Sequence, residues 1–150
     1  MSSKVISGSA VKWYQTMVSI PAKKRGVHKV TELFSGLPCI KNIKIGTMNI
    51  FIQHTSASLS INECWDGSVR DDMEMMLNRL VPENAPYTHT LEGADDMPAH
   101  VKCSLMGSSV TLPITEGKFN IGTWQGIWLC EHRDHGGSRK CIVTVQGCEE

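Results

Sequence analysis

The order of strand-forming and helix-forming segments along the chain constrains its fold most strongly. Segments rich in β-branched and aromatic residues, punctuated by glycine and proline, occur towards both ends of the chain. We expect strands at residues 10–20, 48–53, 109–114, 126–132 and 140–145, with 59–63 as a short continuation of the second. Helical segments lie between them, and the gaps in the last third are of hairpin length. This order predicts an α+β fold with a mostly antiparallel β-sheet and two or three helices.

Three segments have the periodicity or the end signals of helices. Apolar residues recur at helical intervals across residues 27–37. Residues 67–80 form the clearest helix, because Asp66 suits its N-cap position. A shorter helix is expected over residues 96–106, with a glycine directly after it. The apolar stripe of the clearest helix is expected to face the core, and it consists of Val69, Met73, Met76, Leu77 and Leu80.

The composition is that of an ordinary globular protein. The 150 residues contain no linker or internal repeat, which predicts one domain over residues 1–150. Fifteen basic and fifteen acidic residues balance, so no overall charge attracts nucleic acid or a membrane surface. No stretch resembles a signal peptide or a membrane span, and the six cysteines are interpreted as free thiols of a cytoplasmic protein. The basic turn at residues 23–26 is interpreted as a solvated loop.

Three polar segments combine histidines, carboxylates and hydroxyls in a way that packing alone does not require, and they cover residues 53–66, 89–100 and 122–139. A zinc-type ion needs about three or four imidazole or carboxylate ligands from different elements. We expect His54, His89 and His100 to provide them, with further ligands or tautomer-fixing partners among Glu92, Asp95 and Asp96. In the alternative interpretation Asp96 is a helix cap, Glu92 a loop charge and His89 a surface residue.

The same segments offer candidate nucleophiles. Thr55, Ser56 and Ser58 present hydroxyls and closely spaced backbone N–H groups, which suit an oxyanion. A serine nucleophile is disfavoured because no GxSxG elbow occurs. A cysteine nucleophile at Cys64 is equally disfavoured, because the adjacent Glu63 opposes formation of a thiolate.

Two further positions suit a bound ligand. Arg139 follows a flexible turn and is interpreted either as a solubilising hairpin residue or as a clamp on a phosphate or carboxylate. Trp124 and Gln125 lie between glycines, which predicts a close approach of the backbone to a strand or a ligand.

Three blocks together resemble the YjbQ-like family, also described as the secondary thiamine-phosphate synthase family. They are HTSASLSINE (54–63), HTLEGADDMPAH (89–100) and GTWQGIWLCEH (122–132). The resemblance implies a compact α+β homotrimer with a polar site near the subunit boundary, and weak thiamine-phosphate synthase activity in some members. The site residues expected besides the three histidines are Thr55, Ser56, Asn62, Glu63, Asp66, Glu92, Trp124, Gln125, Glu131 and Arg139.

We therefore expect a metal-dependent enzyme acting on a small phosphorylated or heterocyclic substrate. Glu63, Asp66, Glu92 and Arg139 are the candidate catalytic residues, with Glu63 or Asp66 as base and Arg139 steering the anion. Zinc is favoured over magnesium, because the histidine-rich ligand set suits a metal that activates water. The alternative is a non-catalytic trimer that binds a metabolite or a metal.

Overall fold

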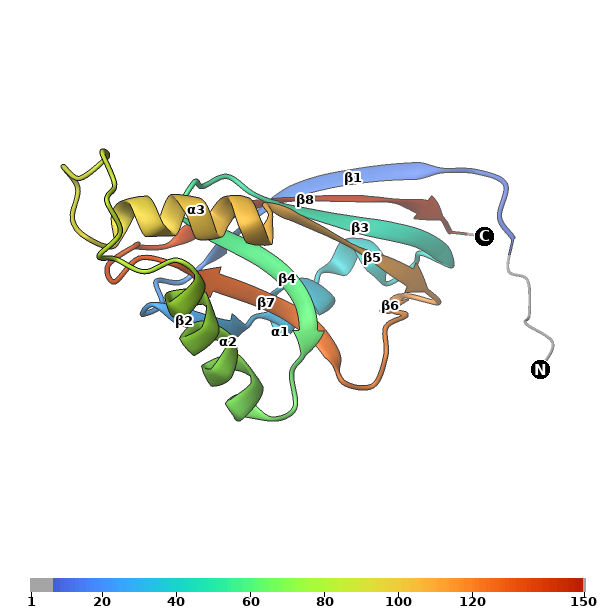
Figure 1. Ribbon diagram of the computed structural model, residues 1–150. Coiled ribbons are helices and arrows are strands. Elements are labelled where there is room, and N and C mark those ends of the chain that lie inside the picture. The colour runs from blue at the N-terminus through green and yellow to red at the C-terminus, as the bar shows by residue number, and fades with distance from the viewer. Residues whose placement is uncertain (1–6, 150) are drawn as a thin grey trace.

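Two antiparallel sheets and three helices make up the fold of the computed structural model, which describes residues 7–149 (Figure 1). The larger sheet has the strand order β1-β8-β3-β5-β6 and the smaller sheet β2-β7-β4. Their strands are β1 (Lys12–Ile20), β2 (Gly26–Lys29), β3 (Ile45–Ile52), β4 (Ala57–Glu63), β5 (Ser109–Thr115), β6 (Lys118–Phe119), β7 (Gln125–Glu131) and β8 (Arg139–Cys148). The helices are α1 (Thr31–Ser35), α2 (Gly67–Leu80) and α3 (Asp96–Met106), with a 3-10 turn η1 (Pro38–Ile40). The expected α+β fold is thus confirmed.

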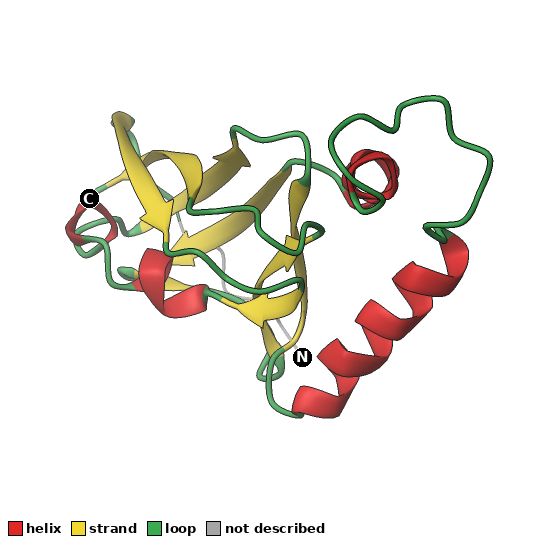
Figure 2. Ribbon diagram, turned by 90° about the vertical axis from the view of Figure 1, so that its left-hand side faces the viewer, coloured by secondary structure: helices red, strands yellow, loops and turns green. Residues whose placement is uncertain are grey.

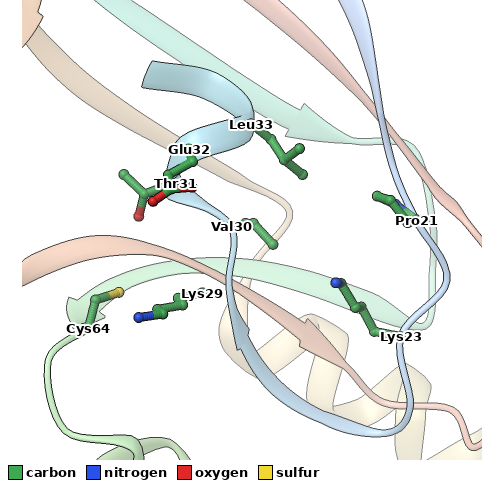
Figure 3. Close-up of a pocket in the computed structure, with 8 residues that line it drawn as sticks. All are labelled: Pro21, Lys23, Lys29, Val30, Thr31, Glu32, Leu33 and Cys64. Atoms are coloured by element: carbon green, nitrogen blue, oxygen red, sulfur yellow. The ribbon is translucent and has the colours of Figure 1, made fainter. Parts of the chain in front are cut away.

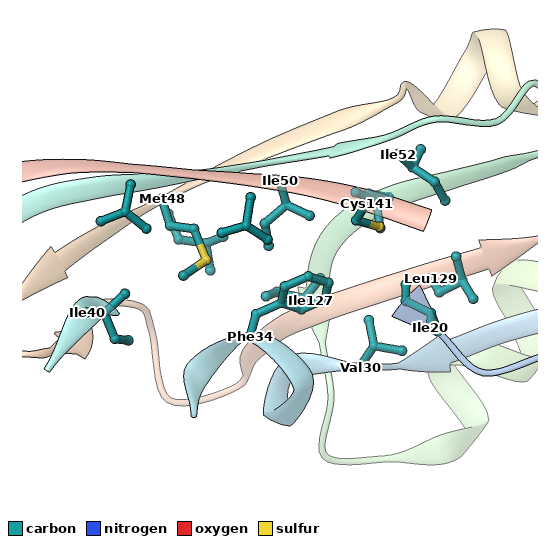
Figure 4. Packing of buried hydrophobic residues seen from close by; sticks show 14 of the residues in the cluster. Ile20, Val30, Phe34, Ile40, Met48, Ile50, Ile52, Ile127, Leu129 and Cys141 are labelled. Carbon is teal, nitrogen blue, oxygen red and sulfur yellow. The ribbon is translucent and has the colours of Figure 1, made fainter. Parts of the chain in front are cut away.

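The main hydrophobic core lies between the two sheets. Alternate residues of β3, namely Met48, Ile50 and Ile52, are almost fully buried, as expected for a strand with one face in the core. Figure 4 shows Met48 and Ile50 facing Ile127 of β7 and Phe34 of α1. Each such buried side chain contributes about 1.5–3 kcal/mol to stability.

Helix α2 packs against β2, and α3 packs against β4 (Figures 1 and 2). The Asp66 carboxylate caps α2 by accepting from the Ser68 N–H at 2.9 Å, as the sequence predicts. The expected core stripe of α2 is wrong, however. Only Leu77 is buried and Val69 and Met73 are half-buried, whereas Met76 and Leu80 are 42% and 67% exposed. No described helix is long and apolar enough to cross a membrane.

Two local expectations are corrected by long-range strand pairing. Residues 26–29 form strand β2 rather than the start of a helix, because Val27 and Lys29 pair with Cys130 and Trp128 of β7. Residues 57–63 form strand β4 of the smaller sheet rather than a continuation of β3. The chain therefore crosses from one sheet to the other at residues 53–56, and this crossing places His54, Thr55 and Ser56 at one end of β4.

Candidate metal centre

His89, Asp96 and His100 form the only group of three or more potential metal ligands that meet within 4.8 Å in the described part of the chain. His89 comes from the loop between α2 and α3, and the other two residues come from the first turns of α3. Asp96 and His100 are four residues apart, so the helix places them on one face. The carboxylate atom Asp96 Oδ2 lies 2.8 Å from His89 Nε2 and 3.3 Å from His100 Nε2.

The Asp96 carboxylate is held rigidly in place. Its side chain is 1% exposed, and its second oxygen, Oδ1, accepts from Arg133 Nη1 at 2.5 Å. The same guanidinium donates to Asp95 and to the Glu92 carbonyl oxygen. Burial raises the pKa of Asp95, but hydrogen bonds from the Asp134 N–H and Arg133 outweigh it and hold that pKa below its usual value. Arg133 thus fixes the loop and leaves Asp96 Oδ2 facing both imidazoles.

The backbone determines the tautomer of His100. Its Nδ1–H donates to the Thr55 carbonyl oxygen at 2.9 Å, so in the neutral ring Nε2 carries the lone pair. That lone pair faces the carboxylate oxygen Asp96 Oδ2 at 3.3 Å. Two acceptor atoms at this distance repel each other unless a positive charge, either a proton or a metal ion, lies between them. A carbonyl that orients a histidine through Nδ1 is the usual arrangement around a ligating Nε2.

His54 lies outside this group, in contrast to the three-histidine site expected from the sequence. Its Nε2 accepts from the Lys140 N–H at 2.8 Å, and its Nδ1 lies 3.3 Å from Arg139 Nη1. Burial, followed by the positive charge of Arg139, lowers the pKa of His54. Two of the three expected histidines are thus brought together, and Asp96 occupies the third place.

Arg139 and Glu131 form a buried ion pair beside the crossing segment. Arg139 is 4% exposed and Glu131 is fully buried, and two hydrogen bonds of 2.8 and 2.5 Å join them. The same guanidinium donates to the Ser56 hydroxyl at 3.0 Å. The interpretation of Arg139 as a solubilising hairpin residue is therefore wrong, because its donors hold the strand crossing in place. Steering of a substrate anion by Arg139 requires this pair to open.

The remaining expected site residues gather at the other end of the small sheet. Asn62 and Glu63 end β4 opposite Gly126 and Gln125, whereas Ala57, near His100, lies opposite Glu131. Six residues of strand separate the two ends, which corresponds to about 20 Å. This second group therefore does not join the metal centre within one chain, and its members are Asn62, Glu63, Asp66, Trp124 and Gln125.

The contacts of this second group are mainly structural. One oxygen of Glu63 accepts from the backbone N–H groups of Trp65 and Asp66, which fixes the turn into α2. The exposed rings of Trp65 and Trp124 meet edge to face, with their centroids 5.7 Å apart. The structure thus assigns Glu63 and Asp66 to a turn and a helix cap, remote from the histidines that they were expected to assist.

The sequence did not indicate Arg133 as a site residue. For Asp96 it allowed two interpretations, a metal ligand or a helix cap. The N-cap residue of α3 is Asp95, not Asp96, and the side chain of Asp96 points towards the two histidines and Arg133. The i, i+4 spacing of Asp96 and His100 within a helical segment was the available signal. No local pattern indicates Arg133, which reaches α3 from beyond the end of β7.

The fold and site together make this chain a small α+β protein in which a His–Asp–His group lies at one end of a three-stranded sheet. The family model described as UPF0047 protein YjbQ-like matches residues 16–148. The chain therefore belongs to the YjbQ/UPF0047 family, which confirms the resemblance seen in its three motif blocks.

Relatives and solved structures agree with this assignment. The UPF0047 protein YjbQ of Escherichia coli O157:H7 is 52% identical over 136 residues, covering 90% of this chain and 99% of that protein. An uncharacterized YjbQ/UPF0047 family protein of Clostridium acetobutylicum superposes with a TM-score of 0.76 at 33% identity, covering 85% and 97% of the two chains. A protein of unknown function from Sulfolobus solfataricus shares the fold, with a TM-score of 0.78 at 22% identity and coverage of 92% and 99%.

Proposed function

We propose that the protein is a metal-dependent enzyme whose divalent ion is held by His89 Nε2, Asp96 Oδ2 and His100 Nε2. The observation that carries the proposal is the opposition of two lone-pair atoms, His100 Nε2 and Asp96 Oδ2, at 3.3 Å. Two imidazoles and one carboxylate suit zinc better than magnesium, which prefers oxygen ligands and retains its waters.

Three protein ligands leave a coordination position for water or substrate. The histidine side chains are accessible from solvent, with His89 49% and His100 30% exposed. A cavity of about 240 Å³ adjoins the centre and is lined in part by Tyr87, His89 and Met97. Such a space suits a small molecule, and a zinc-type ion supplies Lewis-acid activation of water there.

Thiamine-phosphate synthase activity, which the family resemblance implies for some members, is proposed only as a weak side reaction of this centre. Transfer between phosphorylated substrates needs cationic groups to neutralise the phosphates. The nearest guanidiniums, Arg133 and Arg139, already pair with Asp95, Asp96 and Glu131. Chemistry on water and small substrates is therefore favoured over pyrophosphate displacement.

Metal analysis of untagged protein purified without chelator tests the proposal. We expect about one zinc per chain in the wild type and in the control His135→Ala, whose side chain is exposed and does not belong to the group. Asp96→Asn and His100→Ala are expected to lose the metal while remaining folded. Equal metal content in all four proteins contradicts the assignment. A loaded protein that binds metabolites only stoichiometrically, without turnover, supports the alternative of a non-catalytic binding protein.

We further propose the homotrimer that the family resemblance implies and the cytoplasmic location expected from the sequence. Support for assembly comes from large apolar side chains at the surface, since Leu91, Trp65 and Trp124 are 97%, 78% and 56% exposed. Support for a reducing compartment comes from six free cysteines. Light scattering that shows a monomer at micromolar concentration contradicts the trimer.

A further inference from the structure

Two adjoining cavities lie around strand β2, away from the proposed metal centre. The first has a volume of about 460 Å³ and is lined by residues of the β1–β2 connection, β2, α1 and the end of β4 (Figure 3). Pro21, Val30 and Leu33 give it apolar walls, Lys23 and Lys29 supply cations, and Glu32 is its one acidic residue. It therefore combines the two properties that an amphiphilic anion requires.

The second cavity shares Lys23 and Lys29 with the first, and it has a volume of about 330 Å³. Its further lining includes Lys24 and Arg70, so that four cations surround it, whereas Asp71 is its one acidic residue. The apolar first cavity thus opens beside a strongly basic one.

The described lysines of these cavities lack carboxylate partners, although the whole chain is electrically neutral. Within residues 7–149, no carboxylate lies at ion-pair distance from Lys23, Lys24 or Lys29. The Nη1 atom of Arg70 is buried and has no hydrogen-bond acceptor. Neighbouring Arg25, in contrast, lies within 4.0 Å of three carboxylates. A buried guanidinium N–H without a hydrogen-bond acceptor is uncommon in folded proteins.

We propose that these cavities bind a small organic phosphate, with the phosphate in the basic cavity and its apolar body in the other. A guanidinium and several ammonium groups match the charge and acceptor geometry of a phosphate. The apolar body fits between Pro21, Val30 and Leu33. In this proposal the basic turn at residues 23–26 helps to bind the phosphate, whereas the sequence alone suggested a solvated loop.

The proposed phosphate site is independent of the metal centre and goes beyond the proposed function. Lys29 pairs with Trp128 on β7, and Cys64 of the first cavity follows the end of β4. None of the residues that line the two cavities belongs to the His89–Asp96–His100 group. Chelation of the metal should therefore leave binding in the two cavities intact.

Calorimetric titration with phenyl phosphate and with inorganic phosphate, in the presence of chelator, tests the proposal. We expect phenyl phosphate to bind about tenfold more tightly than inorganic phosphate, because only the ester fills the apolar cavity. Arg70→Gln should weaken both probes about tenfold, whereas Leu33→Ser should weaken phenyl phosphate alone.

Two lysine variants complete the design. Lys29→Met changes an exposed side chain, so it tests the site even if Arg70→Gln fails to fold. Lys118→Met, on remote β6, is the matched control and should bind like the wild type. Absence of binding to the wild type, or equal weakening by Lys29→Met and Lys118→Met, overturns the proposal.

Discussion

Acidification should destabilise this protein through His132, a residue immediately after β7. The ring is 1% exposed, its Nε2 lies 2.7 Å from the Ser58 hydroxyl, and its Nδ1 is buried with no hydrogen-bond partner. Burial, followed by the positive charges of Lys102, Arg139 and Arg25, lowers the pKa of His132 from 6.5 to about 3. The folded protein therefore keeps this imidazole neutral under mildly acidic conditions.

The sign and size of the effect follow from proton linkage. Between pH 6.5 and about 3 the unfolded chain binds a proton at His132 that the folded chain refuses, so the free energy of unfolding falls as the pH falls. With these two pKa values, the loss between pH 7.5 and 5.0 is about 2 kcal/mol. Most of the loss occurs below pH 6.5.

Urea unfolding at pH 7.5 and 5.0 measures this loss. His132→Asn removes the titrating group, and its stability should depend on pH by about 2 kcal/mol less than that of the wild type. His135→Ala removes an exposed histidine and should retain the full dependence. Identical pH dependence in the wild type and His132→Asn refutes the reasoning.

Three other substitutions should change stability by amounts that urea unfolding resolves. Arg139→Met leaves the buried Glu131 carboxylate unpaired and should cost about 3–5 kcal/mol, and adding Glu131→Gln should recover part of that loss; a loss below 1 kcal/mol contradicts a tight buried pair. Gly126→Ala places a Cβ 2.5 Å from Cys64 Sγ and should cost about 1–3 kcal/mol, whereas full stability contradicts the close packing. Asp66→Ala removes the cap of α2 and should cost about 1 kcal/mol, and an unchanged midpoint argues against the cap.

Local patterns predict those parts of the fold that depend on neighbours in sequence. The cap and length of α2 follow from Asp66 and helical spacing, and the alternating strands predict an antiparallel α+β fold. Local patterns do not predict strand β2 at residues 26–29. Its pairing with β7, a hundred residues away, overrides a local helical pattern.

The sequence predicts the kinds of residues that form the candidate site, but not which of them lie together. The motif blocks indicate that His89 and His100 are functional residues, and these two do meet. They do not reveal that the strand crossing turns His54 towards Arg139 and Lys140, away from that group. Nor do they show that Glu63 and Gln125 lie at the far end of the small sheet. Which segments converge is decided by the sheet register, which a single sequence does not display.

Anomalous diffraction at the zinc absorption edge, from crystals grown with zinc, tests the metal centre most directly. The account predicts one strong peak about 2.0–2.2 Å from His89 Nε2, Asp96 Oδ2 and His100 Nε2. A protein whose three side chains keep their places with no peak among them, or with zinc bound at His54 instead, contradicts it.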